Sequence, residues 1–225
     1  MATTTAGFEA ARRRMVETQL AARGVRDPLV LAAMGKVPRE QFVSARQAAR
    51  AYEDGPLPIG EGQTISQPYI VALMTEALAL ARADRVLEIG TGSGYSAAVL
   101  AEIAAEVYTV ERLAWLADRA RQHLADLGYA NVHVVTGDGT LGWPDHAPYD
   151  AIVAAAGGPR VPPALLEQLA IGGRLVIPVG PVLADQRLVR IVRAAAEDYR
   201  REELEAVVFV PLIGAQGWPE RKGAR

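Results

Sequence analysis

The stretch that decides the fold is Val86-Leu87-Glu88-Ile89-Gly90-Thr91-Gly92-Ser93-Gly94-Tyr95. Its apolar first half, interrupted by one carboxylate, has the character of a strand, and three alternating glycines follow. The next residues, from Ser96 to Ile103, predict a helix. A strand followed by a glycine-rich turn and a helix N-terminus places backbone N–H groups beside a nucleotide-like ligand. The stretch therefore predicts the nucleotide-binding part of an α/β fold.

After this stretch, segments of strand and helix character alternate along the chain. The expected elements are strands at 85–89, 107–111, 132–136, 150–154 and 174–179, and helices at 95–105, 113–127 and 162–169. Such alternation predicts a mainly parallel sheet with helices on both faces. The last two expected strands, 187–193 and 205–212, have no long apolar helix between them. They predict an antiparallel hairpin at the edge of what would be a seven-stranded sheet.

The chain before residue 83 has a different character and predicts a helical extension. The expected elements are helices at 8–24, from Asp27-Pro28 to Val37-Pro38, at 39–51 and at 69–82, with a Gly- and Pro-rich loop at 52–68 that apolar residues pack in place. Asp27 suits a helix N-cap and Pro28 the first helical position. We expect an N-terminal helical extension with an active-site loop at 1–82, a core domain at 83–218 and a disordered tail at 219–225.

Composition sets limits on the function. The net charge of −2 predicts no nucleic-acid partner, and the absence of cysteine excludes disulfides, thiol nucleophiles and Cys-based zinc sites. The three histidines, His123, His133 and His146, show no metal-ligand spacing, so we expect no metal. No apolar run is long enough to cross a membrane, and the first residues lack the apolar centre of a signal peptide. We expect a cytoplasmic protein.

The residues around the glycine turn indicate which cofactor it holds. A dinucleotide-binding turn has a third glycine where this chain has the bulky Tyr95. Glu88 at this place would repel a pyrophosphate but suits a cofactor with a cationic amino group. Glu111 and Asp138 end the next two expected strands. Glu111 alone would also suit the ribose of NAD, but acids at three successive strand ends favour S-adenosylmethionine.

Several further stretches carry a resemblance to a known family. They are Met15–Leu20, Val37–Phe42, Gly60–Pro68, Gly137–Gly139, Pro148–Ile152, Gly172–Gly180 and Phe209–Leu212. Together with the glycine turn, they make the chain resemble the protein-L-isoaspartate (D-aspartate) O-methyltransferases from about Met15 to Trp218. The glycine turn is common to many methyltransferases, whereas the loop from Gln63 to Pro68 is far more diagnostic of this family.

The resemblance implies a Rossmann-like class I methyltransferase. It would transfer a methyl group from S-adenosylmethionine to the free α-carboxylate of L-isoaspartyl residues in damaged proteins and peptides, leaving S-adenosylhomocysteine. The ester then closes to a succinimide that reopens partly to aspartate, which initiates repair. Ser66 matches the family's active-site serine. The other implied site residues are Glu88, Gly90 and Gly92 in the cofactor turn, Glu111 at the ribose, Asp138 and Gly139 at the adenine, Thr64 and Ile65 between cofactor and substrate, and Val210 to Ile213 along the substrate peptide.

The expected reaction needs no strong base, because a carboxylate nucleophile is already ionised at neutral pH. Hydroxyl groups such as that of Ser66 can orient it, although from the residues alone Ser66 could instead cap the helix that starts near Pro68. The chain departs from the family after the fourth expected strand, where the family often has Ala-Ala-Pro and this chain has Ala155-Ala156-Gly157-Gly158-Pro159. It also departs at Ile213, where some members have a hydroxyl. Gln216 could reach the cofactor or the substrate.

Three other functions are alternatives that the sequence allows. The first is a related carboxylate methyltransferase with a specialised peptide or small-molecule substrate, and the second is an NAD-dependent oxidoreductase. The third is a non-catalytic cofactor-binding or scaffold protein. Such a protein would be expected to have lost some of the four residues Glu88, Glu111, Asp138 and Ser66, which are all present. For the enzyme that the family implies, we expect isoaspartyl proteins as partners, a monomer, and no contact with nucleic acid or membrane.

Overall fold

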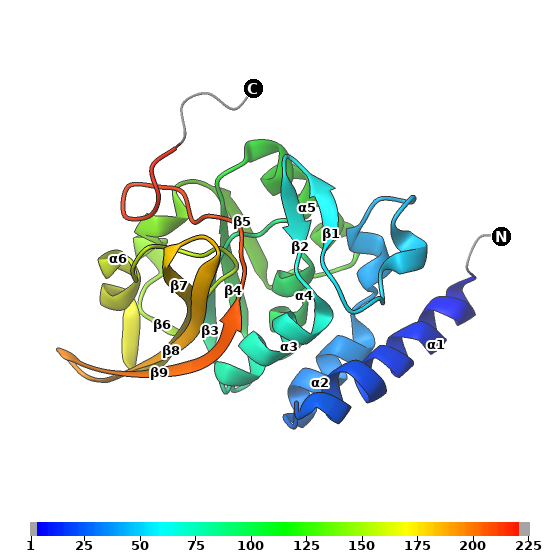
Figure 1. Ribbon diagram of the computed structural model, residues 1–225, viewed down its shortest axis with the longest axis horizontal. Helices are drawn as coiled ribbons and strands as arrows, with labels where there is room; N and C mark the ends of the chain where they lie inside the picture. Colours follow the sequence, from blue (N-terminus) through cyan, green and yellow to red (C-terminus); the bar gives the residue numbers. More distant parts are fainter. Residues whose placement is uncertain (1–3, 221–225) are drawn as a thin grey trace.

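A seven-stranded sheet forms the centre of the computed structural model, which describes residues 4–220 (Figure 1). Its strand order is β5-β4-β3-β6-β7-β8-β9. The strands are β3 (Arg85–Ile89), β4 (Glu106–Glu111), β5 (Val132–Thr136), β6 (Tyr149–Ala154), β7 (Leu169–Val182), β8 (Asp185–Ala195) and β9 (Asp198–Val207). The strands from β5 to β7 in this order pair in parallel, whereas β8 and β9 pair antiparallel. The predicted mainly parallel sheet with an antiparallel edge is confirmed.

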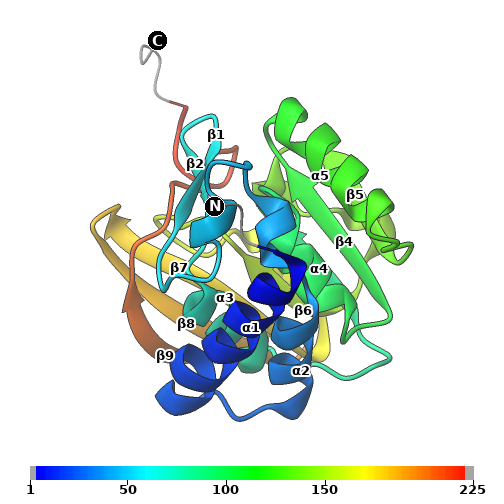
Figure 2. The ribbon, with the colours of Figure 1, turned by 90° about the vertical axis from the view of Figure 1, so that its right-hand side faces the viewer.

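Side chains of the central strands alternate between two apolar layers. Val86 and Val107 pack in the layer that includes the helices on the N-terminal side of the molecule, which Figure 2 shows in front of the sheet. Leu87 and Ile89 pack in the opposite layer together with α6. The helices of the two layers are α3 (Pro68–Ala77), α4 (Tyr95–Ala101), α5 (Ala114–Asp126) and α6 (Pro163–Glu167). Strands that are buried on both faces read as nearly continuous apolar runs, as β3 does.

The N-terminal helices share the first of these layers. The first expected helix begins at Thr5 as α1 (Thr5–Met15) and continues through a π-helical turn (Val16–Leu20) and a 3-10 turn (Ala21–Arg23). α2 (Pro28–Lys36) begins as predicted, because the Asp27 carboxylate accepts a hydrogen bond of 2.8 Å from the backbone N–H of Leu29. Met15 and Met34 are fully buried in the same cluster as Val86. The N-terminal segment therefore packs directly on the nucleotide-binding part.

Two N-terminal predictions are wrong. In place of a helix at 39–51, the chain forms two separate 3-10 turns, Arg39–Phe42 and Ala48–Arg50. The first turn ends because Val43 has an extended backbone, and the buried side chain of Arg39 then reaches across to the carbonyl oxygen of Ala51. In place of a loop at 52–68, the chain forms an antiparallel hairpin of β1 (Leu57–Gly60) and β2 (Gln63–Ile65).

The last strand also differs from its prediction at 205–212. β9 starts at Asp198 and ends at Val207, and the residues after Val207 leave the ladder. Much of β9 is charged and exposed, which suits an edge strand because charges there discourage pairing with another chain. Of the tail expected at 219–225, residues 221–225 lie outside the described part of the chain.

None of the helices within residues 4–220 has the length and apolar character that crossing a membrane requires.

Candidate active site

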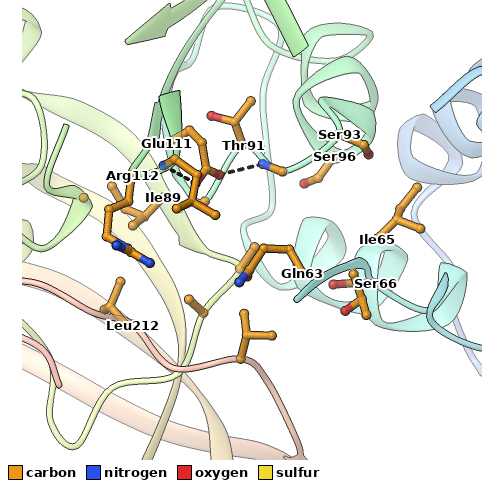
Figure 3. A pocket seen from close by; sticks show the side chains of 18 of the residues that line it. Gln63, Ile65, Ser66, Ile89, Thr91, Ser93, Ser96, Glu111, Arg112 and Leu212 are labelled. Carbon is orange, nitrogen blue, oxygen red and sulfur yellow. Dashed lines mark hydrogen bonds between the residues drawn. The ribbon is translucent and has the colours of Figure 1, made fainter. Parts of the chain in front are cut away.

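A crevice opens at the carboxyl ends of β3, β4 and β6, where the order of the strands in the sheet departs from their order in the chain (Figure 3). Ligands of open α/β sheets bind at such switch points. The glycine turn and the residues that follow β4 line one part of it. β2 with Ser66, and the segment 210–213, form further parts of its wall. The crevice thus joins the two regions that the sequence analysis singled out, the glycine turn and the loop before it.

The glycine turn has the backbone that its sequence predicts. Gly90, Gly92 and Gly94 all have positive φ, at 92°, 54° and 89°, where side chains are strained. A Cβ on Gly92 would lie 3.3 Å from Cδ1 of Ile59, so the β1–β2 hairpin packs directly on the turn. Tyr95, at the place of a third dinucleotide glycine, is buried and lines the crevice. Its ring occupies space that a closely packed pyrophosphate turn leaves free.

Glu111 lies in the crevice, at the end of β4. Its Oε2 accepts a hydrogen bond of 2.9 Å from the N–H of Gly92, and its Oε1 accepts one of 3.0 Å from the N–H of Leu113 (Figure 3). The carboxylate therefore holds the glycine turn and the start of α5 at a fixed separation. It is also the acid at the end of the second strand, the place at which ribose hydroxyls are bound in this kind of fold.

Glu88 is not where the sequence analysis expected it. Its side chain is fully buried and does not line the crevice, whereas the next residue, Ile89, does. Its Oε2 accepts a hydrogen bond of 2.7 Å from the hydroxyl of Thr109, and its Oε1 has no partner within residues 4–220. Burial raises the pKa of Glu88 to about 7, although the hydroxyls of Thr109 and Ser96 act in the opposite direction. Strand alternation turns this acid into the layer beneath the turn.

Asp138 also lies outside the lining of the crevice, although Gly139 contributes to it. Its Oδ1 accepts hydrogen bonds from the N–H and the hydroxyl of Thr140, at 2.9 and 2.6 Å, and its Oδ2 accepts one of 2.7 Å from the N–H of Ala215. Burial alone would raise the pKa of Asp138, but these hydrogen bonds outweigh it and lower the pKa. Asp138 thus fixes the C-terminal segment rather than lining the crevice. A Cβ on Gly139 would come within 2.5 Å of Ile89, so only glycine fits there.

Thr64 and Ile65 of β2 and the next residue, Ser66, line the crevice, as predicted. Thr64 and Ser66 also line a second groove, which extends along the end of β9 and the residues that follow it, 205–210. The carbonyl oxygen of Ser66 accepts a hydrogen bond of 2.7 Å from Arg39. The N-cap of α3 is Gln67 and has no side-chain capping bond, so the structure does not support a capping role for Ser66.

The segment from Val210 to Ile213 also lines the crevice, and Val210 lines the second groove as well. Gln216 does not reach the site. Its Oε1 accepts a hydrogen bond of 3.0 Å from the N–H of Ala164 at the start of α6. Gly157 forms a parallel bridge with Pro211, and its N–H donates a hydrogen bond of 2.8 Å to the carbonyl oxygen of Val210. The departure at Gly157-Gly158 therefore lies directly beside the expected substrate edge.

Sequence reasoning missed several residues of the crevice wall. Arg112 follows Glu111 and lines the crevice (Figure 3). Its guanidinium forms an ion pair with Glu220 at 3.1 Å. Gln63 and Ser96 line it as well. The signal for Arg112 was its position directly after a strand-end acid. Gln63 had a weaker signal, since it opens the diagnostic loop but was not assigned a role.

Comparisons with known proteins agree with this geometry. The sequence profile of the family "Protein-L-isoaspartate(D-aspartate) O-methyltransferase" matches residues 10–217. The chain is 64% identical over 207 residues to protein-L-isoaspartate O-methyltransferase 2 of Pelobacter propionicus. The aligned region covers 92% of each of the two chains.

Solved structures show the same similarity. A protein-L-isoaspartate O-methyltransferase matches with a TM-score of 0.82 and 31% identity, over 91% of this chain and 67% of that one. A proposed protein-L-isoaspartate O-methyltransferase of Plasmodium falciparum, solved with S-adenosylhomocysteine, shares the fold with a TM-score of 0.75 and 24% identity, over 88% of this chain and 96% of that one. The chain therefore belongs to the protein-L-isoaspartate (D-aspartate) O-methyltransferase family and is an S-adenosylmethionine-dependent methyltransferase.

Proposed function

We propose that the crevice is the place where this chain methylates the free α-carboxylate of L-isoaspartyl residues, with Ser66 as the residue that orients the carboxylate. The observation that carries this proposal is the position of Ser66 and Thr64. Both line the crevice beside the glycine turn and also the adjoining groove along residues 205–210. A cofactor in the crevice and a peptide in the groove would therefore meet at these two hydroxyls.

The chain's own residues suit S-adenosylmethionine in the crevice. Glu111 offers a carboxylate that backbone N–H groups already orient, Gly90 and Gly92 let the backbone approach closely, and Gly139 lies at the end expected for adenine. A carboxylate near the turn favours a cofactor with positive charge over a pyrophosphate. When bound, this cofactor supplies an electrophilic methyl group on a sulfonium. Glu88 and Asp138 would support the site from behind, through the turn and the C-terminal segment.

At the substrate end, the chain has to align an oxygen and exclude water. Thr64 and Ser66 can donate hydrogen bonds to a carboxylate without adding charge, and Val210 and Ile213 provide an apolar wall. No proton has to be removed from an ionised carboxylate. The ester formed would leave the site and close to a succinimide, so that this methylation initiates repair.

Binding measurements test this proposal separately from turnover. We expect S-adenosylhomocysteine to bind the purified chain with one site per chain in a calorimetric titration, and NAD not to displace it. Competition by NAD would instead favour the oxidoreductase alternative. Absence of any binding of S-adenosylhomocysteine would remove the crevice as the cofactor site.

We also propose that the protein is cytoplasmic and monomeric and that it contacts neither nucleic acid nor membrane. The division of the chain into an N-terminal extension at 1–82 and a core at 83–218 is likewise part of the proposal. The net charge of −2 supports the expectation about nucleic acid. Light scattering at concentrations used for activity would test the monomer, for which we expect a mass near 24.0 kDa.

A further inference from the structure

The side chain of Gln186 continues the sheet where β9 leaves it. Gln186 pairs with Val207, the last residue of β9, and its side chain is 2% exposed. Its Oε1 accepts a hydrogen bond of 2.8 Å from the N–H of Phe209, and its Nε2 donates one of 3.3 Å to the carbonyl oxygen of Phe209. A primary amide presents an N–H donor and a carbonyl acceptor side by side, so it can bond both the N–H and the C=O of one backbone residue, as a neighbouring strand does. Gln186 thus takes the place of a strand partner for Phe209.

Gly157 holds the same segment from its other side. Its N–H donates to the carbonyl oxygen of Val210 at 2.8 Å, and its carbonyl oxygen accepts from the N–H of Leu212 at 2.9 Å. The indole of Trp218 donates to that same carbonyl oxygen at 3.0 Å. The position of Val210 is therefore fixed in two ways: Gln186 bonds the preceding residue, Phe209, and Gly157 bonds Val210 itself.

The two holding residues are matched to each other. A Cβ on Gly157 would lie 2.5 Å from Nε2 and 2.6 Å from Cδ of Gln186. Non-bonded atoms do not approach a Cβ this closely, so an alanine at position 157 requires the Gln186 amide to move. Gly157 has no positive φ, so its backbone conformation does not demand glycine. The space taken by the Gln186 amide explains the glycine at this position, where the sequence analysis noted a departure from the family.

We propose that Gln186 and Gly157 form a matched pair of positioning residues that sets the substrate edge at Val210. Val210 lines both the cofactor crevice and the adjoining groove, so its position affects how a peptide lies against Ser66. The proposal rests on the proposed function, because it assigns the groove to the isoaspartyl peptide. It predicts an effect on peptide binding with little effect on the cofactor, since neither residue lines the crevice.

The test compares Gln186→Met, which keeps the size but loses the amide, with Gln122→Met as a matched control. Gln122 bonds Asp126 on the exposed side of α5. We expect the KM for an L-isoaspartyl peptide to rise about five- to tenfold in Gln186→Met, since each hydrogen bond lost weakens the edge by a factor of this order. The KM for S-adenosylmethionine should stay within about twofold in both variants. Equal rises in both KM values, or no rise in either, would overturn the proposal.

A double-variant comparison tests the matching. We expect Gly157→Ala alone to raise the peptide KM as Gln186→Met does, and Gly157→Ala combined with Gln186→Ala to be no worse than Gln186→Ala alone. Additive effects would contradict the pairing. Gly157→Ala keeps every native side chain, so it provides the comparison should Gln186→Met not fold.

Hydrogen exchange separates this inference from the proposed function. The Phe209 amide should exchange faster in Gln186→Met than in the native chain, whatever the enzyme acts on. Unchanged exchange would overturn the positioning role. A native chain that does not methylate the isoaspartyl peptide would instead contradict the proposed function, and with it the assignment of the groove.

Discussion

Nη2 of the buried Arg39 donates a hydrogen bond of 2.7 Å to the carbonyl oxygen of Ser66. Nε of the same guanidinium donates one of 2.7 Å to the carbonyl oxygen of Ala51, and its Cζ lies 4.8 Å from the ring centroid of Tyr95. Burial lowers the pKa of Arg39. One side chain therefore ties the N-terminal segment to the proposed catalytic serine and to the first helical residue after the glycine turn.

Arg39→Lys should lower kcat/KM for the peptide in a chain that still folds. A lysine keeps the charge but lacks the planar fork that reaches two carbonyl groups at once. We expect kcat/KM for the peptide to fall at least about tenfold, the equivalent of one lost hydrogen bond to a charged donor. Steady-state kinetics on this variant and on Arg46→Lys, which changes an exposed arginine of the same segment, would check it. Similar values in both variants would show that Arg39 does not hold Ser66 for catalysis.

Ser66→Ala should lower kcat without abolishing turnover. The hydroxyl would orient a nucleophile that is already ionised, and a hydrogen bond to a charged group contributes about 1.5–3 kcal/mol, which corresponds to about 10- to 150-fold. The cofactor affinity should change little. Ser44→Ala, in an exposed part of the chain, is the control. Loss of all measurable activity, with folding intact, would contradict a purely orienting role of Ser66 and would point to a covalent or proton-transfer role.

Glu111→Gln should weaken binding of S-adenosylhomocysteine. The carboxylate accepts hydrogen bonds from Gly92 and Leu113, and a neutral amide makes weaker ones and presents one oxygen only. We expect the dissociation constant to rise about tenfold or more. Glu106→Gln, at the exposed start of the same strand, should leave it within about twofold. Calorimetric titration of both variants decides the point, and equal affinities would remove Glu111 from the cofactor site.

Glu88 should make stability depend on pH. The pKa of its buried carboxyl is about 7, above the ordinary value of 4.5, so between these values the folded chain binds a proton that the unfolded chain does not. The free energy of unfolding must then fall as pH rises through this range, by about 3 kcal/mol in total. Glu88→Gln is uncharged at every pH and should lack this fall.

Urea unfolding at pH 5 and pH 8 measures this difference. We expect Glu88→Gln to gain stability relative to the native chain between the two pH values, whereas Glu53→Gln, at an exposed carboxyl that faces Arg50, should not. A gap between Glu88→Gln and the native chain that does not change with pH would mean that Glu88 is ionised in the folded chain throughout.

Much of the fold could be predicted because local signals and packing agree. Asp27 and Pro28 are residue types that favour the start of a helix, and α2 starts there. The apolar run before Gly90 favours a buried strand, and it forms β3. The hairpin at 57–65 was missed, since Pro58 and the glycines around it suggest a loop. It forms because Ile59 and Ile65 are buried, a tertiary effect that no local propensity contains. β9 was misplaced because its charged residues hide a strand at a sheet edge.

The candidate site could be predicted only in part. The crevice is lined, as the sequence suggested, by Glu111 at the last position of β4 and by Ser66 and Gly139, which come after β2 and β5. Glu88 is still within its strand, so alternation turns it beneath the turn. Oδ2 of Asp138 accepts a hydrogen bond from the N–H of Ala215, which lies 77 positions away in the sequence. No spacing pattern in the sequence could reveal that contact.

The central claim is methyl transfer to the isoaspartyl α-carboxylate, and one assay tests it most directly. Two peptides would differ only in carrying L-isoaspartate or L-aspartate, and both would be incubated with the native chain and methyl-labelled S-adenosylmethionine. The account predicts base-labile methyl ester on the isoaspartyl peptide and none on its partner. Equal labelling of both peptides, or labelling of neither while the cofactor binds, would contradict it.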